Sequence, residues 1–418
     1  MDRAIICIDL KTFYASVECV ERKLDPFTTN LVVADETRGN GTICLAISPK
    51  MKMLGVKNRC RVFEIPKNIK YIKARPRMRL YMKYAADIYE MYLEYIAKED
   101  IHVYSIDEVF IDVTDYLKTY NMKATEFAKF LIKEIYKRFG LTATAGVGTN
   151  LYLAKVALDI MSKHTVTNIG WLTESKYKKE LWQHTPLTDF WQIGRGIEKR
   201  LNKLHIYTME DIAHANEKKL YKEFGINAEL LIDHSKGIET CTMKDIKAYK
   251  PKQKSISGSQ VLFEDYPWDK ARIILKEMVE LKSLELIEKN LVTNNISLYI
   301  GYSKDIIHAT GGSVKLTNYT NVYSELSKQM LRLYDRTTKP NYPIRRIGVG
   351  FNNVQEEKYV QLDFFVNTEK QDKEKNIESA ISKIKLTMGG NAVLRGTSYE
   401  EGATAKLRNT LIGGHNAN

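Results

Sequence analysis

The chain has 418 residues, of which 44% are apolar and 28% charged, and its formal net charge is +13 at pH 7. This length predicts more than one domain and excludes a single small module, while the apolar fraction is sufficient for packed cores. A protein this basic favours a polyanion as its partner.

The five cysteines, at positions 7, 19, 44, 60 and 241, are odd in number and show neither a CxxC pair nor metal-ligand spacing. This usage is typical of a reducing compartment. The apolar run at residues 4–8 is too short for a signal peptide, and no run approaches the length of a membrane span. We therefore expect a cytoplasmic protein that has no membrane partner and acts as a monomer.

The N-terminal part alternates between strand and helix patterns, which predicts an α+β fold. We expect strands at 4–9, 31–34, 41–46 and 142–147, a hairpin at 101–105 and 109–113, and helices at 11–22, 50–54, 76–97, 123–138 and 150–163.

From residue 171 to about 241 the pattern is helical, and residues 244–254 hold five lysines and read as an exposed linker. The next elements predict a separate split βαβ domain. They are strand 255–263, helix 268–290, strands 293–302 and 309–316, helix 321–334 and strand 344–351. A last helix is expected at 372–386, followed by a loosely ordered end.

Two acidic signatures carry most of the chemical information. Residues 5–14 read IICIDLKTFY and residues 104–112 read YSIDEVFID, so an apolar run meets a carboxylate in each. Asp9, Asp107 and Glu108, if brought together, would repel one another unless a cation lay among them. Hard oxygen ligands suit Mg²⁺, and two such ions can hold the attacking and leaving oxygens of a phosphoryl transfer. The signatures therefore predict a nucleotidyl-transfer enzyme.

Each acidic signature also has a structural interpretation. Asp9 could cap the helix that follows it, and Asp107 with Glu108 could form an ordinary acidic turn. The joint occurrence of the two signatures favours the catalytic interpretation.

Two further features favour a nucleic-acid partner. Residues 50–83 contain twelve Lys or Arg against one acid, Glu64, whereas an ordinary solvated face carries mixed charges. Gly194, Arg195 and Gly196 open a helix, where backbone N–H groups can bind a phosphate as in a helix-hairpin-helix. By itself this second signal is weak, and a simple helix turn is an equal alternative.

The chain resembles the Y-family translesion DNA polymerases, and most closely their bacterial UmuC-like branch. The resemblance covers residues 4–360. It rests on Asp-x-x-x-Phe-Tyr-Ala-Ser-Val-Glu at residues 9–18, on Ser-Ile-Asp-Glu at 105–108, and on Ile-Arg-Arg-Ile-Gly-Val at 344–349. It implies a right-hand polymerase with a ferredoxin-like palm (1–24 and 80–168), small fingers (25–79), a helix-hairpin-helix thumb (169–243), a linker (244–254), a βαββαβ little finger (255–358) and a C-terminal tail (359–418).

The resemblance also implies roles for single residues. Asp9, Asp107 and Glu108 would be the catalytic metal ligands for two Mg²⁺ ions, and the Leu10 carbonyl would complete one metal shell. Tyr14 would be the steric gate, which stacks under the sugar and excludes a 2′-OH. The alternative is that Tyr14 is a core aromatic.

Further nucleotide contacts follow from the same resemblance. Phe13 belongs to the nucleotide site, although Phe13 and Tyr14 point different ways on a helix and at most one can serve the core fully. Lys52 and Lys163 match basic positions that bind the triphosphate. For Lys163 the alternative is a cation at a helix C-terminus. Pro49 departs from the family, because many relatives have an aromatic or small residue there, and it weakens the prediction of triphosphate contacts in the fingers.

DNA and clamp contacts complete the set of predicted sites. DNA-binding positions are Gly194, Arg195, Gly196, Lys254, Arg345 and Arg346. Gln192 stands where the helix-hairpin-helix usually has a glycine, which puts one phosphate contact in doubt. Residues Gln361, Leu362, Phe364 and Phe365 resemble the bacterial sliding-clamp peptide, in which apolar side chains enter a pocket. The alternative for that peptide is a buried edge strand.

We therefore expect a template-directed, low-fidelity DNA polymerase that performs translesion synthesis in an SOS-type response to DNA damage. Its expected partners are primer–template DNA, a dNTP and the sliding clamp, with a RecA-type filament as a further candidate that no residue identifies. One alternative is another enzyme on a similar palm, such as a nucleotidyl cyclase, which would leave residues 171–351 unexplained. The other is a non-catalytic DNA-binding or clamp-binding accessory protein.

Overall fold

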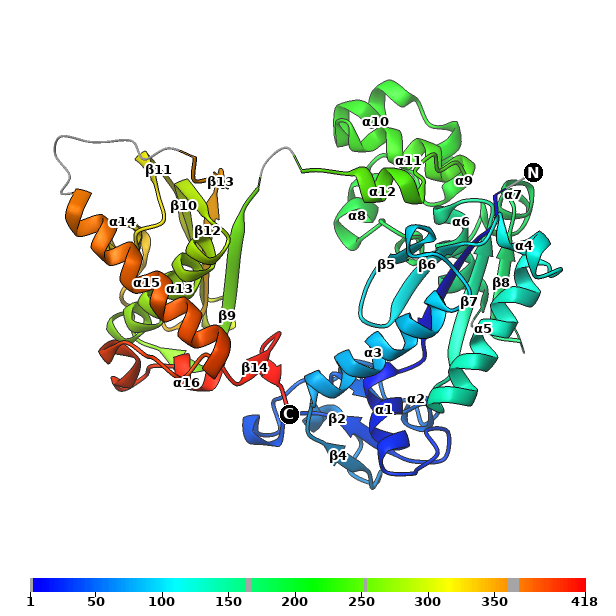
Figure 1. Cartoon of the computed structure of the whole chain (residues 1–418). Helices are drawn as coiled ribbons and strands as arrows, with labels where there is room; N and C mark the ends of the chain where they lie inside the picture. Colours follow the sequence, from blue (N-terminus) through cyan, green and yellow to red (C-terminus); the bar gives the residue numbers. More distant parts are fainter. Residues whose placement is uncertain (1–2, 163–164, 166, 252–253, 359–367) are drawn as a thin grey trace. The chain divides into compact units, whose positions relative to one another are not determined.

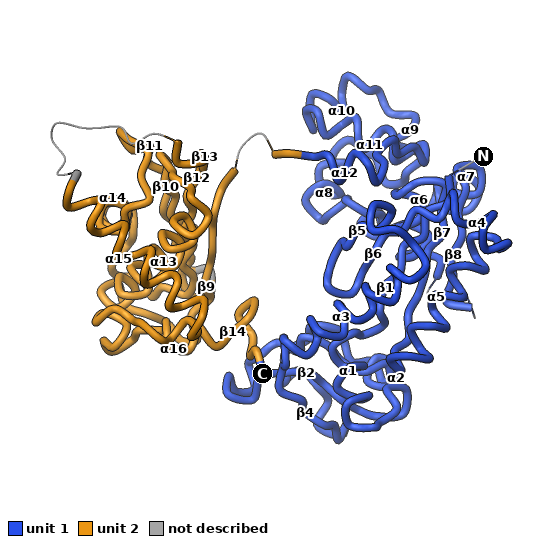
Figure 2. Tube along the Cα trace, viewed as in Figure 1, with its two compact units in different colours: residues 1–249, 418 blue, residues 250–417 orange. Residues whose placement is uncertain are grey.

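The computed structural model describes residues 3–162, 165, 167–251, 254–358 and 368–418. The chain divides into two compact units, residues 1–249 with 418 and residues 250–417 (Figure 2). Separate hydrophobic cores lie in the two units. Among the described residues, no helix combines the length and apolar character needed to cross a membrane.

A five-stranded sheet with the order β5-β6-β1-β7-β8 forms the centre of unit 1 (Figure 1). Its strands are β1 (Ile5–Leu10), β5 (Ile101–Val103), β6 (Glu108–Asp112), β7 (Ala143–Gly148) and β8 (Ile169–Leu172). Strand β1 is antiparallel to both of its neighbours, while β7 and β8 are parallel. The central position of β1 explains its continuous apolar run, because both faces of the strand are covered.

Unit 1 also contains the helices α1 (Phe13–Glu21), α3 (Met78–Leu93), α4 (Tyr116–Thr119), α5 (Ala124–Phe139) and α6 (Leu151–Val156), and α6 continues as a π-helical turn at Ala157–Met161. Helices α5 and α6 pack on strands β1 and β7 of the central sheet, and α3 packs against α1 and α5. Glycine is required where α6 lies on β7. A Cβ at Gly146 would be 2.0 Å from the carbonyl oxygen of Ala154, and a Cβ at Gly148 would be 2.2 Å from its nitrogen. Of the expected helix 150–163, the structure describes residues 150–162, which are α-helical over Leu151–Val156 and π-helical over Ala157–Met161.

The predicted fingers contain a small sheet with the order β3-β2-β4. Its elements are β2 (Leu31–Val33), β3 (Ala46–Ile47), β4 (Ile72–Ala74) and the helix α2 (Pro49–Met53). The strand expected at 41–46 is wrong for most of its length, since before Ala46 only Ile43 pairs, in an isolated bridge to Arg61. Strand β4 was not expected, and it is parallel to β2.

A helical region follows β8. It comprises α7 (Glu174–Leu181), α8 (Arg195–Lys203), α9 (Met209–His214), α10 (Glu217–Phe224), α11 (Asn227–Lys236) and α12 (Met243–Ala248). Two predicted boundaries need correction. The thumb cannot begin at residue 169, because β8 belongs to the central sheet. The predicted linker 244–254 is helical up to Ala248, because Thr242 and Asp245 form a capping box and Met243 is buried.

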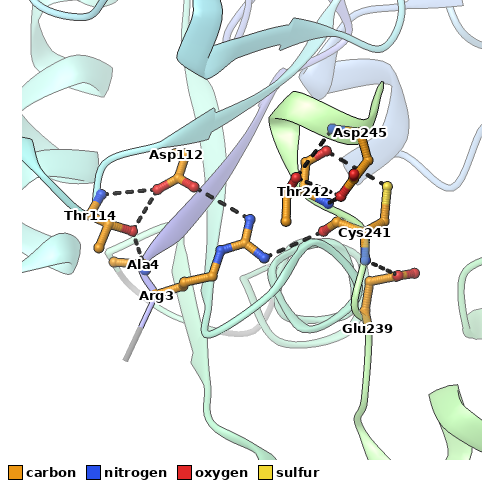
Figure 3. A network of polar contacts seen from close by, with 8 residues as sticks. All are labelled: Arg3, Ala4, Asp112, Thr114, Glu239, Cys241, Thr242 and Asp245. Carbon is orange, nitrogen blue, oxygen red and sulfur yellow. Dashed lines mark hydrogen bonds and ion pairs between the residues drawn. The ribbon is translucent and has the colours of Figure 1, made fainter. Parts of the chain in front are cut away.

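Figure 3 shows how the end of the helical region is held to the central sheet. The Arg3 guanidinium donates to Asp112 at the end of β6 and to the carbonyl of Cys241, each at 3.4 Å. The N–H of Ala4 donates to Thr114 Oγ1 at 3.0 Å. The helical region and the central sheet therefore belong to one compact unit.

Unit 2 contains a four-stranded antiparallel sheet with the order β11-β10-β12-β9, and β13 pairs with β10. Its elements are β9 (Ile256–Tyr266), α13 (Trp268–Glu288), β10 (Leu291–Tyr302), β11 (Thr310–Thr320), α14 (Tyr323–Thr337), β12 (Ile344–Asn352) and β13 (Gln355–Glu356). The predicted βαββαβ order is confirmed. Helices α13 and α14 pack together and contribute to the core of unit 2.

The C-terminal residues fold onto α13 instead of being loosely ordered. Helix α15 (Thr368–Met388) contacts α13, and α16 (Ala405–Arg408) and the hairpin β14 (Leu411–Ile412) and β15 (His415–Asn416) follow. Glu277 of α13 is buried and accepts hydrogen bonds from the N–H groups of Thr404 and Ala405 at 3.0 and 3.1 Å. The buried carboxylate of Glu277 caps α16 and so explains why the C-terminal residues are ordered. The composition of this segment does not indicate such a contact.

Short 3₁₀ turns complete the secondary structure. They lie at Glu36–Arg38, Val62–Glu64, Lys98–Asp100, Leu187–Asp189, Ser303–Asp305 and Gly396–Tyr399.

Candidate active site

Three carboxylates meet at one end of the central sheet. Asp9 and Glu108 are direct partners in the antiparallel pairing of β1 with β6. Asp107 immediately precedes β6, and its carbonyl accepts the N–H of Leu10 at 3.0 Å. The apolar residues of both strands are buried, so the charged residues lie near the strand ends, and Asp9 and Glu108 share one end. We call Asp9, Asp107 and Glu108 the acidic edge.

The electrostatics of the acidic edge are unfavourable without a cation. Burial, together with the charges of Asp107 and Glu108, raises the pKa of Asp9 to about 7. Asp107 and Glu108 therefore lie close enough to Asp9 to disfavour its ionised form. A group of hard oxygen donors with excess negative charge is suited to a divalent cation.

Glu108 is held by two groups that sequence reasoning did not include. Lys155 of α6 places its Nζ 2.7 Å from Oε1 of Glu108, and the Cys7 thiol donates to the same oxygen at 3.1 Å. Burial and the charge of Glu108 raise the pKa of Cys7, so the thiol stays protonated and remains a donor. Lys155 also lies 3.2 Å from Asp159 in the π-helical turn. The side chains of Lys155 and Glu108 are only 10% and 9% exposed, so this is a buried ion pair.

The residues of the acidic edge fit a metal in their chemistry but are not already arranged as ligands. In the described part of the chain, no three His, Cys, Asp or Glu side chains are grouped closely enough to hold a metal ion as they stand. Asp107 accepts a hydrogen bond from Ser105 Oγ at 2.6 Å. The contacts of Glu108 involve Oε1, which leaves its Oε2 for another partner. Small side-chain rotations would therefore have to accompany metal binding.

Phe13 and Tyr14 separate as the helical geometry predicts. Phe13 is 3% exposed and serves the core, whereas Tyr14 is half-buried. Burial and the charge of Asp107 raise the pKa of Tyr14, which places its phenol near the acidic edge. The Tyr14 ring stacks on Tyr81 of α3, with ring centroids 4.4 Å apart and planes 15° apart. This location is compatible with a steric gate, which stays a prediction.

Lys11 interacts electrostatically both with Asp9 of the acidic edge and with Lys52 of α2. Burial and the neighbouring charge of Lys52 lower the pKa of Lys11, against the opposing effect of Asp9. Lys11 donates to Asn168 at 2.5 Å. Two cations close enough to repel each other form a suitable site for a polyanion such as a triphosphate. Lys163 lies outside the described residues.

The predicted DNA-binding positions lie in both units. Gly194 is the N-cap of α8, and Gly194, Arg195 and Gly196 are all exposed. Gln192, just before them, has a φ of +71°, which is the left-handed conformation that glycine adopts without strain.

In unit 2, Lys254 is exposed, Arg345 pairs with Asp265 at 3.3 Å, and the guanidinium of Arg346 lies 5.4 Å from the ring centroid of Tyr299. The predicted clamp residues 361, 362, 364 and 365 lie outside the described residues, so the clamp interpretation remains a prediction from sequence.

Comparison with known proteins identifies the family. The impB/mucB/samB family matches residues 8–159, and the impB/mucB/samB family C-terminal domain matches residues 253–364. UvrX of Bacillus subtilis, a proposed UV-damage repair protein, is 32% identical over 98% of this chain and 97% of its own length. The chain belongs to the impB/mucB/samB family of Y-family translesion DNA polymerases.

Other relatives agree with this assignment. A DNA polymerase IV of B. subtilis is 28% identical over 99% of each chain. The solved structure of a Y-family polymerase chimera of Dbh and Dpo4 has a TM-score of 0.64 and 20% identity over 84% of this chain and 99% of its own. At 20% identity, the similarity to the chimera is evidence for the fold of this Y-family member. The predicted α+β polymerase architecture is thereby confirmed.

Sequence reasoning about this Y-family chain missed Lys11, Lys155 and Tyr81. Lys11 stands two residues after Asp9, so the sequence already indicates that Lys11 lies near the acidic edge. Lys155 and Asp159 have the i, i+4 spacing of a helical ion pair, but nothing local indicates that Lys155 turns toward Glu108. Tyr81 belongs to a helix rich in Tyr and Met, where composition alone does not single it out.

Proposed function

We propose that this Y-family member is a template-directed, low-fidelity DNA polymerase of the DNA-damage response, and that its acidic edge is the nucleotidyl-transfer centre. The observation that carries the proposal is the direct pairing of Asp9 with Glu108, next to Asp107, in an environment that raises the pKa of Asp9 to about 7. Carboxylates arranged in this way lower the stability of the fold, and a bound cation would compensate their negative charge.

Asp9, Asp107 and Glu108, with the Leu10 carbonyl, would hold two Mg²⁺ ions. When bound, two such ions stabilise the attacking 3′-hydroxyl and the leaving oxygen of a phosphoryl transfer. In the protein itself, Lys155 neutralises one oxygen of Glu108 and so limits the repulsion within the acidic edge. The free Oε2 of Glu108 is then available as a ligand.

The incoming dNTP would lie between the acidic edge and the fingers. Lys11 and Lys52 supply positive charge for the triphosphate, and Lys163 is a further candidate from sequence. Tyr14 would lie under the sugar and exclude a ribose 2′-hydroxyl. Phe13 supports this arrangement from the core, with its ring centroid 5.6 Å from that of Tyr14.

Primer–template DNA would be bound through its backbone. The N-terminus of α8 at Gly194–Gly196 offers N–H groups and a positive helix end to one phosphate. Lys254, Arg345 and Arg346 add positive charge on unit 2. Contacts of this kind do not depend on base sequence, and they weaken steeply with salt.

The sliding clamp is the proposed processivity partner, through Gln361, Leu362, Phe364 and Phe365. Leu362→Ala/Phe364→Ala should abolish binding of the full chain to purified clamp in a surface-plasmon experiment, while extension of a primer without clamp stays unchanged. Equal clamp binding by the variant and the wild type would remove this assignment. The RecA-type filament remains a candidate from the sequence resemblance alone.

Primer extension on undamaged and abasic templates with Mg²⁺ tests the central proposal. Wild-type protein should extend both templates, and Asp107→Ala/Glu108→Ala should extend neither. Asp335→Ala, which removes an exposed carboxylate of α14, is the matched control and should retain synthesis. Extension by the double variant would exclude the acidic edge as the catalytic centre, and wild-type DNA binding without synthesis, with or without clamp, would support the accessory-protein alternative.

A further inference from the structure

Three aromatic rings form a compact group beside the acidic edge. Tyr14 stacks on Tyr81 with ring centroids 4.4 Å apart, and the ring of Phe13 lies 6.5 Å from Tyr81 in an edge-to-face arrangement. Tyr81 is fully buried, so one face of the half-buried Tyr14 ring rests on a fixed surface. Burial and the charge of Asp107 raise the pKa of Tyr14, while the charge of Arg59 lowers it.

The position of Tyr14 depends on this stacking. No described residue forms a hydrogen bond with its hydroxyl, so polar contacts within the described part of the chain do not fix the ring. Aromatic stacking in an offset arrangement is attractive and sets both the height and the tilt of a ring. Among the described residues, the stack on Tyr81 and the contact with Phe13 are the ring contacts of Tyr14, and the stack on Tyr81 is the nearer of the two.

Tyr81 is itself held by a buried carboxylate. Its hydroxyl donates to Oε1 of Glu18 at 2.7 Å. Glu18 has no exposed side-chain surface and also accepts two hydrogen bonds from Arg77, each at 2.9 Å, and one from Arg22. A buried carboxylate with three partners is fully satisfied, so it holds the phenol in one orientation.

We propose that Tyr81 is a positioning residue for Tyr14, and that the line Glu18–Tyr81–Tyr14 sets how strictly the polymerase rejects a ribose 2′-hydroxyl. The inference rests on the proposed role of Tyr14 as the steric gate. A ring that excludes a single hydroxyl group must be held precisely in place. An aromatic neighbour that is itself fixed by burial and a hydrogen bond provides that precision. Tyr81 would thus govern sugar specificity although it is fully buried.

Ordinary core packing is the competing explanation for Tyr81. A purely structural role predicts that a substitution lowers stability and slows insertion of deoxyribonucleotides and ribonucleotides by the same factor. A positioning role predicts a change in their ratio. The two explanations therefore differ in a quantity that general destabilisation does not alter.

The test measures single-nucleotide insertion of dNTP and rNTP on one primer–template, as the ratio of the two kcat/KM values. Tyr81→Leu removes the stacked ring and should lower the preference for deoxyribose by about two- to tenfold. Tyr81→Phe keeps the ring and should stay within about twofold of the wild type. Tyr92→Leu is the matched control, because Tyr92 is another tyrosine of α3 and only 2% exposed, and it should leave the ratio unchanged.

Tyr14→Ala is measured in the same series to separate the two hypotheses. An unchanged sugar ratio in Tyr14→Ala removes Tyr14 as the gate and the inference with it. A relaxed ratio in Tyr14→Ala with an unchanged ratio in Tyr81→Leu overturns the inference alone and leaves the proposed function intact. Circular dichroism verifies folding, and Tyr81→Met, a flexible side chain that does not stack, replaces the leucine variant with the same expectation if the latter does not fold.

Discussion

The indole N–H of Trp191 donates a hydrogen bond to the hydroxyl of Tyr104, at 3.1 Å. Trp191 lies just before Gly194, the N-cap of α8, and Tyr104 lies shortly before Asp107 and Glu108. The two rings meet edge to face, with ring centroids 5.9 Å apart. The Nζ of Lys155, which forms the ion pair with Glu108, lies 5.9 Å from the ring centroid of Tyr104. The segment just before the proposed DNA-binding N-terminus of α8 is thus connected to the acidic edge by adjoining side chains.

Trp191→Phe should lower the free energy of unfolding by about 1 kcal/mol, because it removes one hydrogen bond and keeps most of the ring. Urea unfolding measures the change. In a double-mutant cycle, Tyr104→Phe should have little further effect in the Trp191→Phe background. Fully additive effects of the two substitutions would show that the hydrogen bond contributes nothing to stability.

Lys155→Met should leave Glu108 buried without its cation and lower the free energy of unfolding by about 3 kcal/mol. Mg²⁺ should then raise the melting temperature of the variant more than that of the wild type, since a divalent cation can compensate the same carboxylate. Differential scanning fluorimetry with and without Mg²⁺ measures both effects. Lys375→Met is the matched control, because it removes the ion pair with Glu357 in unit 2 and should not change the Mg²⁺ response. An equal Mg²⁺ response in wild type and Lys155→Met would contradict a cation site at Glu108.

Much of the acidic edge could be predicted from local sequence. The buried run before Asp9 and the run after Glu108 each specify a strand, and a strand exposes charge only at its ends. The contact of Lys155 with Glu108 could not be predicted, because it requires α6 to lie against β7. That close approach requires glycine at positions 146 and 148, because a Cβ there would meet the backbone of α6. The sequence shows the two glycines but does not show which helix packs on them.

The boundary errors have a different cause. Strand β8 has four residues and gains its identity from parallel pairing with β7, a contact that local periodicity does not encode. The lysines of α12 favour a linker, whereas Thr242 and Asp245 carry the signal of a helix N-terminus. The helix forms because the capping box is joined by the burial of Met243, which charge density does not indicate.

Glu18→Gln should reveal a pH-dependent contribution to stability. Burial alone would raise the pKa of Glu18, but hydrogen bonds from Arg77, Tyr81 and Arg22 lower it below its ordinary value. A lowered folded-state pKa contributes stability above the unfolded value of about 4.3, and this stability is lost as the pH falls through the folded-state pKa. Because the two arginines are 34% and 35% exposed, we expect a loss of about 2 kcal/mol at pH 7.

Urea unfolding of wild type and Glu18→Gln at pH 7, 5 and 3.5 measures this dependence. The difference between the two proteins should be largest at pH 7 and should shrink at pH 3.5. Glu94→Gln is the matched control, because Glu94 also accepts two hydrogen bonds from one arginine but is exposed, and it should change stability little at any of these pH values. A difference that stays constant with pH would mean that the charge of Glu18 does not contribute.

Gln192→Gly should stabilise the protein, which is uncommon for a substitution to glycine. Gln192 is exposed and has a φ of +71°, so its side chain contributes little packing while its backbone is strained. We expect the free energy of unfolding to rise by about 0.5 kcal/mol, as relief of strain exceeds the added chain entropy of glycine. Gln329→Gly inside α14 is the matched control and should lower it by about 1 kcal/mol, because glycine is unfavourable within a helix. Urea unfolding of both variants measures the two signs, and a loss of stability in Gln192→Gly would show that the glutamine side chain makes a contact that outweighs the backbone strain.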